Sequence, residues 1–94
     1  MTFSILARDP DTGAIGGAAA TGSLCVGGWV LRGDLNAGMS ASQGAAPSTL
    51  WGEEVLQHLR DGSSPKDSVN HVTSHDRGCA YRQLAAMDLL GNAA

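Results

Sequence analysis

The order of apolar and polar stretches at the start of the chain predicts a β-hairpin. An apolar-rich stretch covers residues 2–8, a turn-forming stretch (Asp-Pro-Asp-Thr-Gly) covers 9–13, and a second apolar stretch covers 14–20. Two strand-like stretches on either side of such a turn are typical of antiparallel pairing. The first twenty residues are therefore expected to form one hairpin.

The next segment, residues 21–44, is rich in glycine and contains two further strand-like stretches. These are residues 25–31 (CVGGWVL) and 36–42 (NAGMSAS). Glycine and alanine weaken a strand, but they let another layer or a ligand approach the backbone closely. We therefore expect two more strands in a region that lies close to a ligand or to a second layer.

Helical periodicity replaces the strand pattern in the middle of the chain. The segment 47–49 precedes a helix that ends at Gly62. The apolar stripe of this helix consists of Trp51, Val55, Leu56 and Leu59. A second helix is expected to begin with Ser64 as N-cap and Pro65 at the first helical position, and to end before Gly78.

A last strand, residues 81–87, leads into a tight turn at 88–91, and residues 92–94 begin a returning strand. The aspartate that opens the turn can bind backbone N–H groups ahead of it, and the glycine that closes it can adopt positive φ. Strands, then two helices, then strands predict an α+β fold. In this fold the helices cover one face of a mainly antiparallel sheet.

The composition indicates a domain that is short of core. The 94 residues suffice for one small domain, and 43% of them are apolar. Glycine, however, accounts for 13 residues, and the aromatic residues are only one Phe, one Tyr and two Trp. We therefore expect residues 1–94 to form one small domain that has few large side chains to fill its core.

Charge and hydropathy exclude two classes of function. A net charge of −3 provides no basic surface for nucleic acid or for an anionic membrane. Arg8 and Asp9 interrupt the apolar start, unlike in a signal peptide, and no apolar run approaches the ~20 residues of a membrane helix. Cys25 and Cys79 are most simply interpreted as reduced thiols of a cytoplasmic protein.

Three blocks of the chain resemble successive parts of a known family. They are TFSILARDPDTGAIGGAAA, NAGMSASQGAAPSTLWGEEVLQHLRDGSSPKDSVN and RQLAAMDLLGNAA. The chain resembles the domain-of-unknown-function family 1028, which belongs to the N-terminal-nucleophile (Ntn) hydrolase superfamily and whose members are longer. The resemblance implies that residues 1–94 are a single incomplete domain, the N-terminal half of a four-layer αββα sandwich that a second chain completes.

The resemblance also implies a reaction. Many Ntn hydrolases are made as a precursor that cuts itself before a Thr, Ser or Cys. The freed residue attacks an amide carbonyl, and its own α-amino group, with a pKa of about 7.7–8.0, accepts the proton. We therefore expect Ala94 to be the cleavage end and the nucleophile to follow it in a second (β) chain, opposite Ala85. The expected substrate is a small linear or cyclic amide, and the αβ units are expected to form a higher homo-oligomer.

Two alternatives stay open. If Met1 is removed, Thr2 becomes an N-terminal threonine at the head of a strand, as in proteasome-like enzymes; in the printed sequence a peptide bond to Met1 holds its amine. The other alternative is a non-catalytic binding or assembly domain on the same fold. Such a domain would not be cut and would carry no free nucleophile after Ala94.

Polar residues of the glycine-rich segment are candidates for substrate binding or oxyanion stabilisation. They are Thr21, Ser23, Ser40, Ser42 and Gln43. Ser40 and Ser42 share one face of a strand, and the amide of Gln43 is the best oxyanion donor. The structural alternatives are a loop cap for the first two and a solvated strand face for the other three.

Arg82 begins the last strand and is the one charged candidate. Its guanidinium can clamp a substrate carboxylate, or it can form an ion pair with Asp76 or Asp88 on the surface. Together with the low net charge, Arg82 favours a small amide that carries a carboxylate.

His71, His75 and Cys79 have the spacing H-x3-H-x3-C, and two histidines four residues apart on a helix can share a zinc ion. Gly78 is expected to break the helix before Cys79, and no fourth ligand lies nearby in the sequence. His58 is expected on the solvated face of the preceding helix. We therefore expect neither a metal site nor a cofactor.

Overall fold

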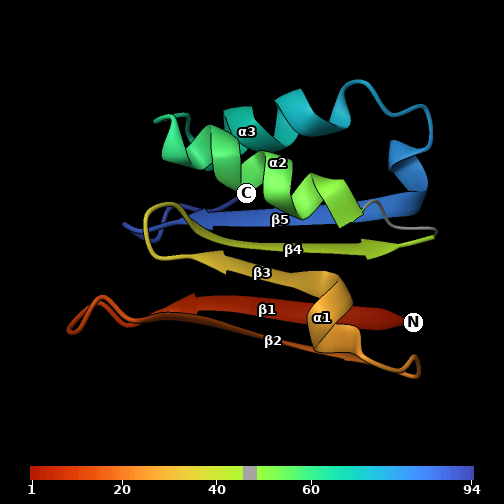
Figure 1. Ribbon diagram of the computed structural model, residues 1–94, viewed down its shortest axis with the longest axis horizontal. Coiled ribbons are helices and arrows are strands. Elements are labelled where there is room, and N and C mark those ends of the chain that lie inside the picture. Colours follow the sequence, from red (N-terminus) through yellow and green to blue (C-terminus); the bar gives the residue numbers. More distant parts are fainter. Residues whose placement is uncertain (46–48) are drawn as a thin grey trace.

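The computed structural model describes residues 1–45 and 49–94, which form an α+β fold with two antiparallel sheets and three helices (Figure 1). The elements, in chain order, are β1 (Thr2–Arg8), β2 (Ile15–Thr21), α1 (Val26–Val30), β3 (Leu31–Asp34), β4 (Gly38–Gly44), α2 (Thr49–Arg60), α3 (Pro65–Thr73), the 3₁₀ turn η1 (Cys79–Tyr81) and β5 (Arg82–Asp88). Among the described residues, no helix is long and apolar enough to cross a membrane.

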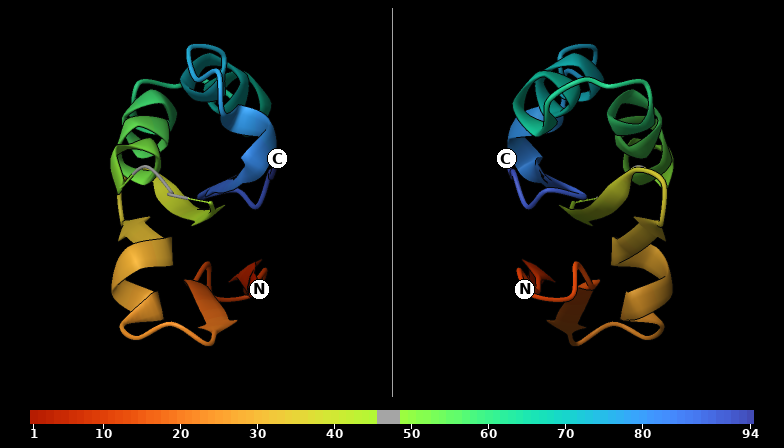
Figure 2. Two further views of the ribbon diagram at one scale, coloured as in Figure 1. Left: turned by 90° about the vertical axis from the view of Figure 1, so that its right-hand side faces the viewer. Right: turned by 90° about the vertical axis from the view of Figure 1, so that its left-hand side faces the viewer.

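The elements stack in three layers. Helices α2 and α3 cover one face of the sheet β3-β4-β5, as the order of elements predicted, and the hairpin β1-β2 forms a separate sheet against the other face. Figure 2 shows the two helices above the three-stranded sheet and the hairpin below it. Helix α1 lies beside β3 and connects the two sheets.

The hairpin β1-β2 confirms the first strand pair. Its register runs from Thr2 opposite Thr21 to Arg8 opposite Ile15, and the Asp9 carboxylate accepts the Asp11 N–H at 2.8 Å in the turn. Burial alternates along β1, so that one face is directed toward β4 and the other outward. The outward face is apolar: the exposed fractions of Phe3 and Ile5 are 66% and 63%.

Strand β4 is buried on both faces. Ser40 and Ser42 lie on the face beneath α2, while Ala41 and Gln43 lie on the face toward β1, and all four are less than 9% exposed. Gly38, at the start of the strand, has φ +138°, and a Cβ there would lie 2.0 Å from the Met87 carbonyl oxygen. The predicted strand 36–42 therefore exists, but it is shifted to 38–44, where the chain can approach β5.

The predicted helix pair is confirmed, and it supplies the core. Gly62, with φ +95°, follows the end of α2, and the Ser64 hydroxyl caps α3 by accepting the Asp67 N–H at 3.1 Å. The main core cluster joins the stripe of α2 to α3 and to the sheet; it consists of Ala37, Trp51, Val55, Leu56, Leu59, Val72 and Ala86. The start signal expected at 47–48 lies outside the described residues.

The prediction of a strand over residues 25–31 is wrong, because residues 26–30 form α1 and a strand begins only at Leu31. Cys25 takes a left-handed conformation with φ +58°, which turns the chain into the helix. The Arg32 guanidinium then donates to the carbonyls of Gly28 at 2.7 Å and Leu31 at 2.8 Å, and so binds acceptors at the helix end. Cys25 and Cys79 are both free and exposed.

The predicted final turn and the register after it are confirmed. The Asp88 carboxylate accepts the N–H groups of Leu90 and Asn92 at 3.0 and 2.9 Å. Ala94 and Ala86 exchange two backbone hydrogen bonds of 3.0 and 2.8 Å. Residues 92–94 therefore extend the sheet on the side of β5 away from β4.

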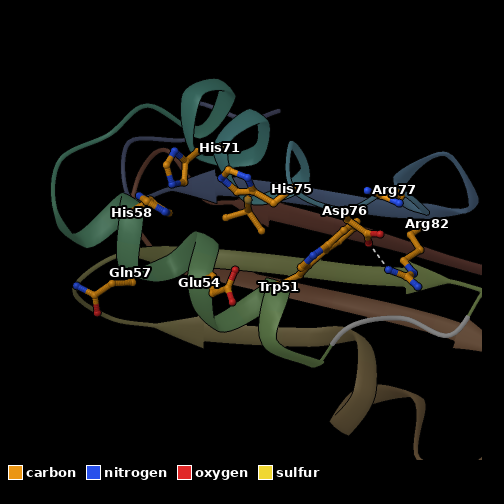
Figure 3. Close-up of a pocket in the computed structure, with 10 residues that line it drawn as sticks. Trp51, Glu54, Gln57, His58, His71, His75, Asp76, Arg77 and Arg82 are labelled. Carbon is orange, nitrogen blue, oxygen red and sulfur yellow. Dashed lines mark hydrogen bonds and ion pairs between the residues drawn. The ribbon is translucent and has the colours of Figure 1, made fainter.

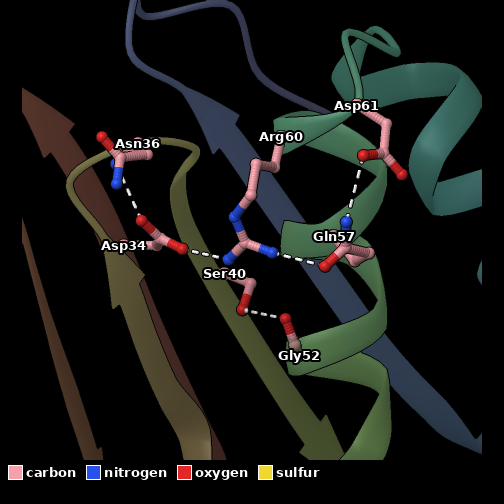
Figure 4. A network of polar contacts seen from close by, with 7 residues as sticks. All are labelled: Asp34, Asn36, Ser40, Gly52, Gln57, Arg60 and Asp61. Carbon is pink, nitrogen blue, oxygen red and sulfur yellow. Dashed lines mark hydrogen bonds and ion pairs between the residues drawn. The ribbon is translucent and has the colours of Figure 1, made fainter.

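A polar network ties α2 to the turn between β3 and β4 (Figure 4). The Arg60 guanidinium pairs with the Asp34 carboxylate, which also accepts the Asn36 N–H at 2.7 Å. The hydrogen bond from Arg60, and then that from Asn36, hold the pKa of Asp34 below its usual range.

We expect Leu56→Ala to destabilise the purified protein by about 2–5 kcal/mol, because Leu56 is 2% exposed in the core between α2 and the sheet. Denaturant unfolding measures this loss. Leu50→Ala is the matched control on the same helix; Leu50 is 63% exposed, and its truncation should change stability by less than about 0.5 kcal/mol. Equal losses would contradict the assignment of the α2 stripe.

We expect Asp34→Asn to remove one acid-sensitive contribution to stability. A carboxyl whose pKa is lowered by folding stabilises the fold above its unfolded pKa, and this contribution is lost as the pH falls through the folded value. Melting temperatures between pH 7 and pH 3 should therefore fall less steeply for Asp34→Asn than for the parent protein. Equal slopes for the two proteins would contradict this role of Asp34.

Candidate functional site

A small pocket opens between the two sheets, where β1 begins and β4 ends. Its volume is about 190 Å³, and Gln43 and Gly44 of β4 line it on the inner side. Hydroxyl groups line one part and apolar side chains of the α1 region line another; these residues include Thr2, Thr21, Ser23, Leu24, Trp29 and Val30. Among the described residues that line this pocket, none carries a charge.

Two threonine hydroxyls form a short chain at the open end of the hairpin. Thr2 and Thr21 are opposite each other in the β1-β2 register. The Thr2 hydroxyl donates to the Thr21 hydroxyl at 2.9 Å, which in turn donates to the Met1 carbonyl oxygen at 3.0 Å. Thr21 and Ser23, which the sequence named as candidates for a binding site, thus line the same pocket as Thr2.

Gln43 joins the sheets immediately behind these hydroxyls. Its Nε2 donates to the Thr2 carbonyl at 2.9 Å and to Gln83 Oε1 at 3.1 Å, while its Oε1 accepts the Ser4 hydroxyl at 2.7 Å. The side chain is only 6% exposed, so the solvated alternative for Gln43 is wrong. Both donor positions of the amide are occupied, and a role as oxyanion donor, which stays a prediction, would require one of them to be released.

Ser40 and Ser42 share one face, as predicted, but this face is directed away from the pocket. They lie under α2 and are 0% and 3% exposed, so a solvated strand face is wrong for them as well. The Ser40 hydroxyl donates to the Gly52 carbonyl at 3.0 Å, and a Cβ at Gly52 would lie 3.1 Å from that hydroxyl. The structure therefore brings Thr2, Thr21, Ser23 and Gln43 together and places the two serines in the helix-sheet contact.

Arg82 also lies apart from the pocket. Its guanidinium pairs with Asp76, one of the two partners named from the sequence, and its Nε donates to the Ala45 carbonyl at 3.1 Å. The guanidinium carbon lies 5.8 Å from the ring centre of Trp51. Arg82 thus faces the helix layer, on the side of the sheet opposite to Thr2.

A second and larger hollow lies between α2 and α3 and has a volume of about 580 Å³ (Figure 3). Here His58 of α2 faces His71 of α3 with their ring centres 4.4 Å apart, and His75 follows at 5.8 Å from His71. Sequence spacing had grouped His71 and His75 with Cys79, which does not line this hollow. As the side chains stand, the described residues contain no group of three or more His, Cys, Asp or Glu arranged to hold a metal ion.

The partnership of His58 with His71 could have been inferred from the short connection between the helices. A connection of a few residues makes neighbouring helices antiparallel, so residues at similar distances before and after it lie side by side. The α2-α3 connection spans residues 61–64. The contact depends on the rotation of each helix, which its apolar stripe sets.

We expect Gln43→Glu to destabilise the protein by about 1–3 kcal/mol at pH 7.5, because two acceptors would then face a buried carboxylate with no donor. Burial and these acceptors raise the pKa of the introduced carboxyl, so it protonates and can donate again as the pH falls toward 5. Thermal unfolding at several pH values should show the loss shrinking at low pH. Asn70→Asp, exposed on α3, is the corresponding change from amide to carboxylate without burial and should be nearly neutral; equal effects would contradict the role given to Gln43.

Comparison with known proteins places this geometry in a family. A family model described as "Family of unknown function (DUF1028)" matches residues 2–94. The solved structure of protein SPO2555 from Silicibacter pomeroyi, described as DUF1028, is similar with a TM-score of 0.96 and 90% identity. The match covers 99% of this chain and 43% of that one, so this chain spans less than half of the solved relative. No functionally curated protein matches. The chain belongs to the family of unknown function DUF1028.

Proposed function

We propose that this chain is the N-terminal half of an Ntn hydrolase that cleaves the C–N bond of a small linear or cyclic amide. The observation that carries the proposal is the face-to-face packing of two antiparallel sheets, with helices on the outer face of one of them. One helix layer and two sheets are three of the four layers of the αββα sandwich that the sequence resemblance implies. Fold alone does not establish an activity, so the proposal also depends on the site.

The outer face of the hairpin supports a fourth layer. Phe3 and Ile5 are opposite Ala20 and Ala18 in the register, so these four side chains share the outward face. Among the described residues, none covers this face, and Phe3 and Ile5 remain well exposed. An apolar sheet face is stable only against another element. Helices from the remainder of the longer family chain would complete the sandwich.

The strand that starts beyond the final turn supports a position for the nucleophile. Ala93 is opposite Met87, and Ala94 is opposite Ala86. Because side chains alternate, the position next to Ala94 would be opposite Ala85 and would be directed between the sheets, like Gln43. A Thr, Ser or Cys there would attack the amide carbonyl, and its freed α-amine would take the proton and pass it to the leaving amine; water would then hydrolyse the acyl-enzyme.

The residues that line the inter-sheet pocket indicate which kind of substrate it could hold. Hydroxyls of Thr2 and Thr21 and the ring of Trp29 line it, and Arg82 lies on the other side of the sheet. We therefore propose an uncharged amide with a small apolar group, in place of the carboxylate-bearing amide that Arg82 had suggested.

Intact-mass measurement and N-terminal sequencing of the full-length protein test the proposal. We expect two chains, the second beginning with Thr, Ser or Cys directly after Ala94, and a single uncut chain when that residue is replaced by Ala. Thr2→Ala in the same full-length protein is the matched control and should still be cut. One chain that has lost Met1 and depends on Thr2 for amide hydrolysis would instead identify Thr2 as the nucleophile. An uncut chain that hydrolyses no amide would favour the alternative of a non-catalytic binding or assembly domain.

A further inference from the structure

A second glutamine lies directly beside Gln43. Gln83 of β5 is opposite Gln43 in the β4-β5 register, so the two side chains share one face of the sheet. This face is directed toward the hairpin, because the neighbours Leu84 and Ala86, on the other face of β5, belong to the core beneath the helices. Gln83 therefore lies on the side of the sheet where the inter-sheet site is found.

The hydrogen bonds around Gln43 fix the orientation of the Gln83 amide. The Thr2 carbonyl can only accept a hydrogen bond, so the Gln43 atom 2.9 Å from it is the donor Nε2. The same Nε2 lies 3.1 Å from Gln83, which must present its acceptor, Oε1. The Nε2 group of Gln83 is thus turned away from Gln43, and within the described part of the chain its N–H donors have no partner.

The register places this free donor near the proposed nucleophile. Ala94 is opposite Ala86, so the position after it is opposite Ala85 and diagonal to Gln83 on the same face. Directly opposite Cβ atoms are about 5 Å apart and diagonal neighbours about 7–8 Å, a distance that a long side chain can span. The other diagonal neighbour is Met87, which is buried and has no N–H or O–H group.

We propose that Gln83 is the oxyanion donor of the inter-sheet site and that Gln43 positions it, an assignment that rests on the proposed hydrolase function. Attack on the carbonyl carbon of the substrate moves an electron pair onto the carbonyl oxygen, and Gln83 Nε2 donates a hydrogen bond to that oxygen. The pair returns to carbon as the C–N bond breaks, and the amine leaves with the proton taken from the nucleophile. Gln43 also lines the pocket proposed for the apolar group of the substrate, so pocket and donor are neighbours.

Kinetics of the full-length protein with the p-nitroanilides of acetic and propionic acid test the assignment. Both probes are uncharged amides with a small apolar acyl group, and both release a coloured amine. Gln83→Glu keeps an acceptor for Gln43 but loses the donor, and Gln83→Met loses the donor without adding a charge. We expect each variant to lower kcat by about 10²–10³-fold with KM unchanged, because the lost hydrogen bond forms only in the transition state. A purely structural role, as acceptor for Gln43, would be preserved in Gln83→Glu.

Asn70→Asp, exposed on α3, is the control for a change from amide to carboxylate and should keep the kcat of the parent. Intact mass counts the cut chains, and kcat is expressed per cut chain. Cut variants of Gln83 with the kcat of the parent would overturn the assignment and leave the proposed function standing. Variants that stay uncut while the parent is cut would also overturn it, because Gln83 would then act in chain cleavage. A parent that hydrolyses neither probe would contradict the proposed function itself.

Discussion

The structure depends on a single strand that has no face in water. Helix α2 covers one side of β4 and the hairpin covers the other, so the buried polar side chains of the strand must find hydrogen-bond partners within the protein. Ser40 meets this requirement through the Gly52 carbonyl, and Gln43 meets it through three partners on β1 and β5. The alternation of a strand thus divides one short sequence, SASQ, between two different contacts.

This division explains why the helix layer and the hairpin layer come so close to the strand. Gly52 allows α2 to approach the Ser40 hydroxyl, and Gly17 on the other side leaves space for the Met39 side chain, which would lie 3.2 Å from a Cβ there. The glycines that made this chain look short of core therefore serve to bring the layers together. The outer face of the hairpin still lacks a covering layer, and Phe3 and Ile5 are exposed there.

Most elements could be predicted from the sequence, because their signals are local. The turn after Arg8, the Ser64 cap and the Asp88 turn each consist of residues within four positions of one another. The segment 25–31 could not be assigned in this way, since a short apolar run fits both a strand and a buried helix turn. Its helix depends on the left-handed Cys25 and on the Arg32 side chain folding back over the helix end.

The candidate site was harder to predict, because its members are defined by the faces of the strands. The sequence named Ser40, Ser42 and Gln43 as candidates for one site, yet only Gln43 lies toward Thr2 and Thr21. Likewise, His58 was expected on a solvated face, and only the packing of two antiparallel helices brings it to His71. Both errors concern tertiary neighbours, which local patterns do not encode.

The connection between β4 and β5 has a consequence for the time course of folding. The two strands of the first hairpin need only a short loop to meet, whereas Gly44 meets Arg82 only after the whole α2-α3 segment has returned. Closing a longer loop costs more entropy, by about 0.6 kcal/mol for each doubling of length, although helices formed within the loop shorten its span. We expect the hairpin and the helix pair to form early and β5 to dock late. The Asp88 turn joins Ala93 to β5 over a few residues, so this strand can pair with β5 before β5 docks on β4.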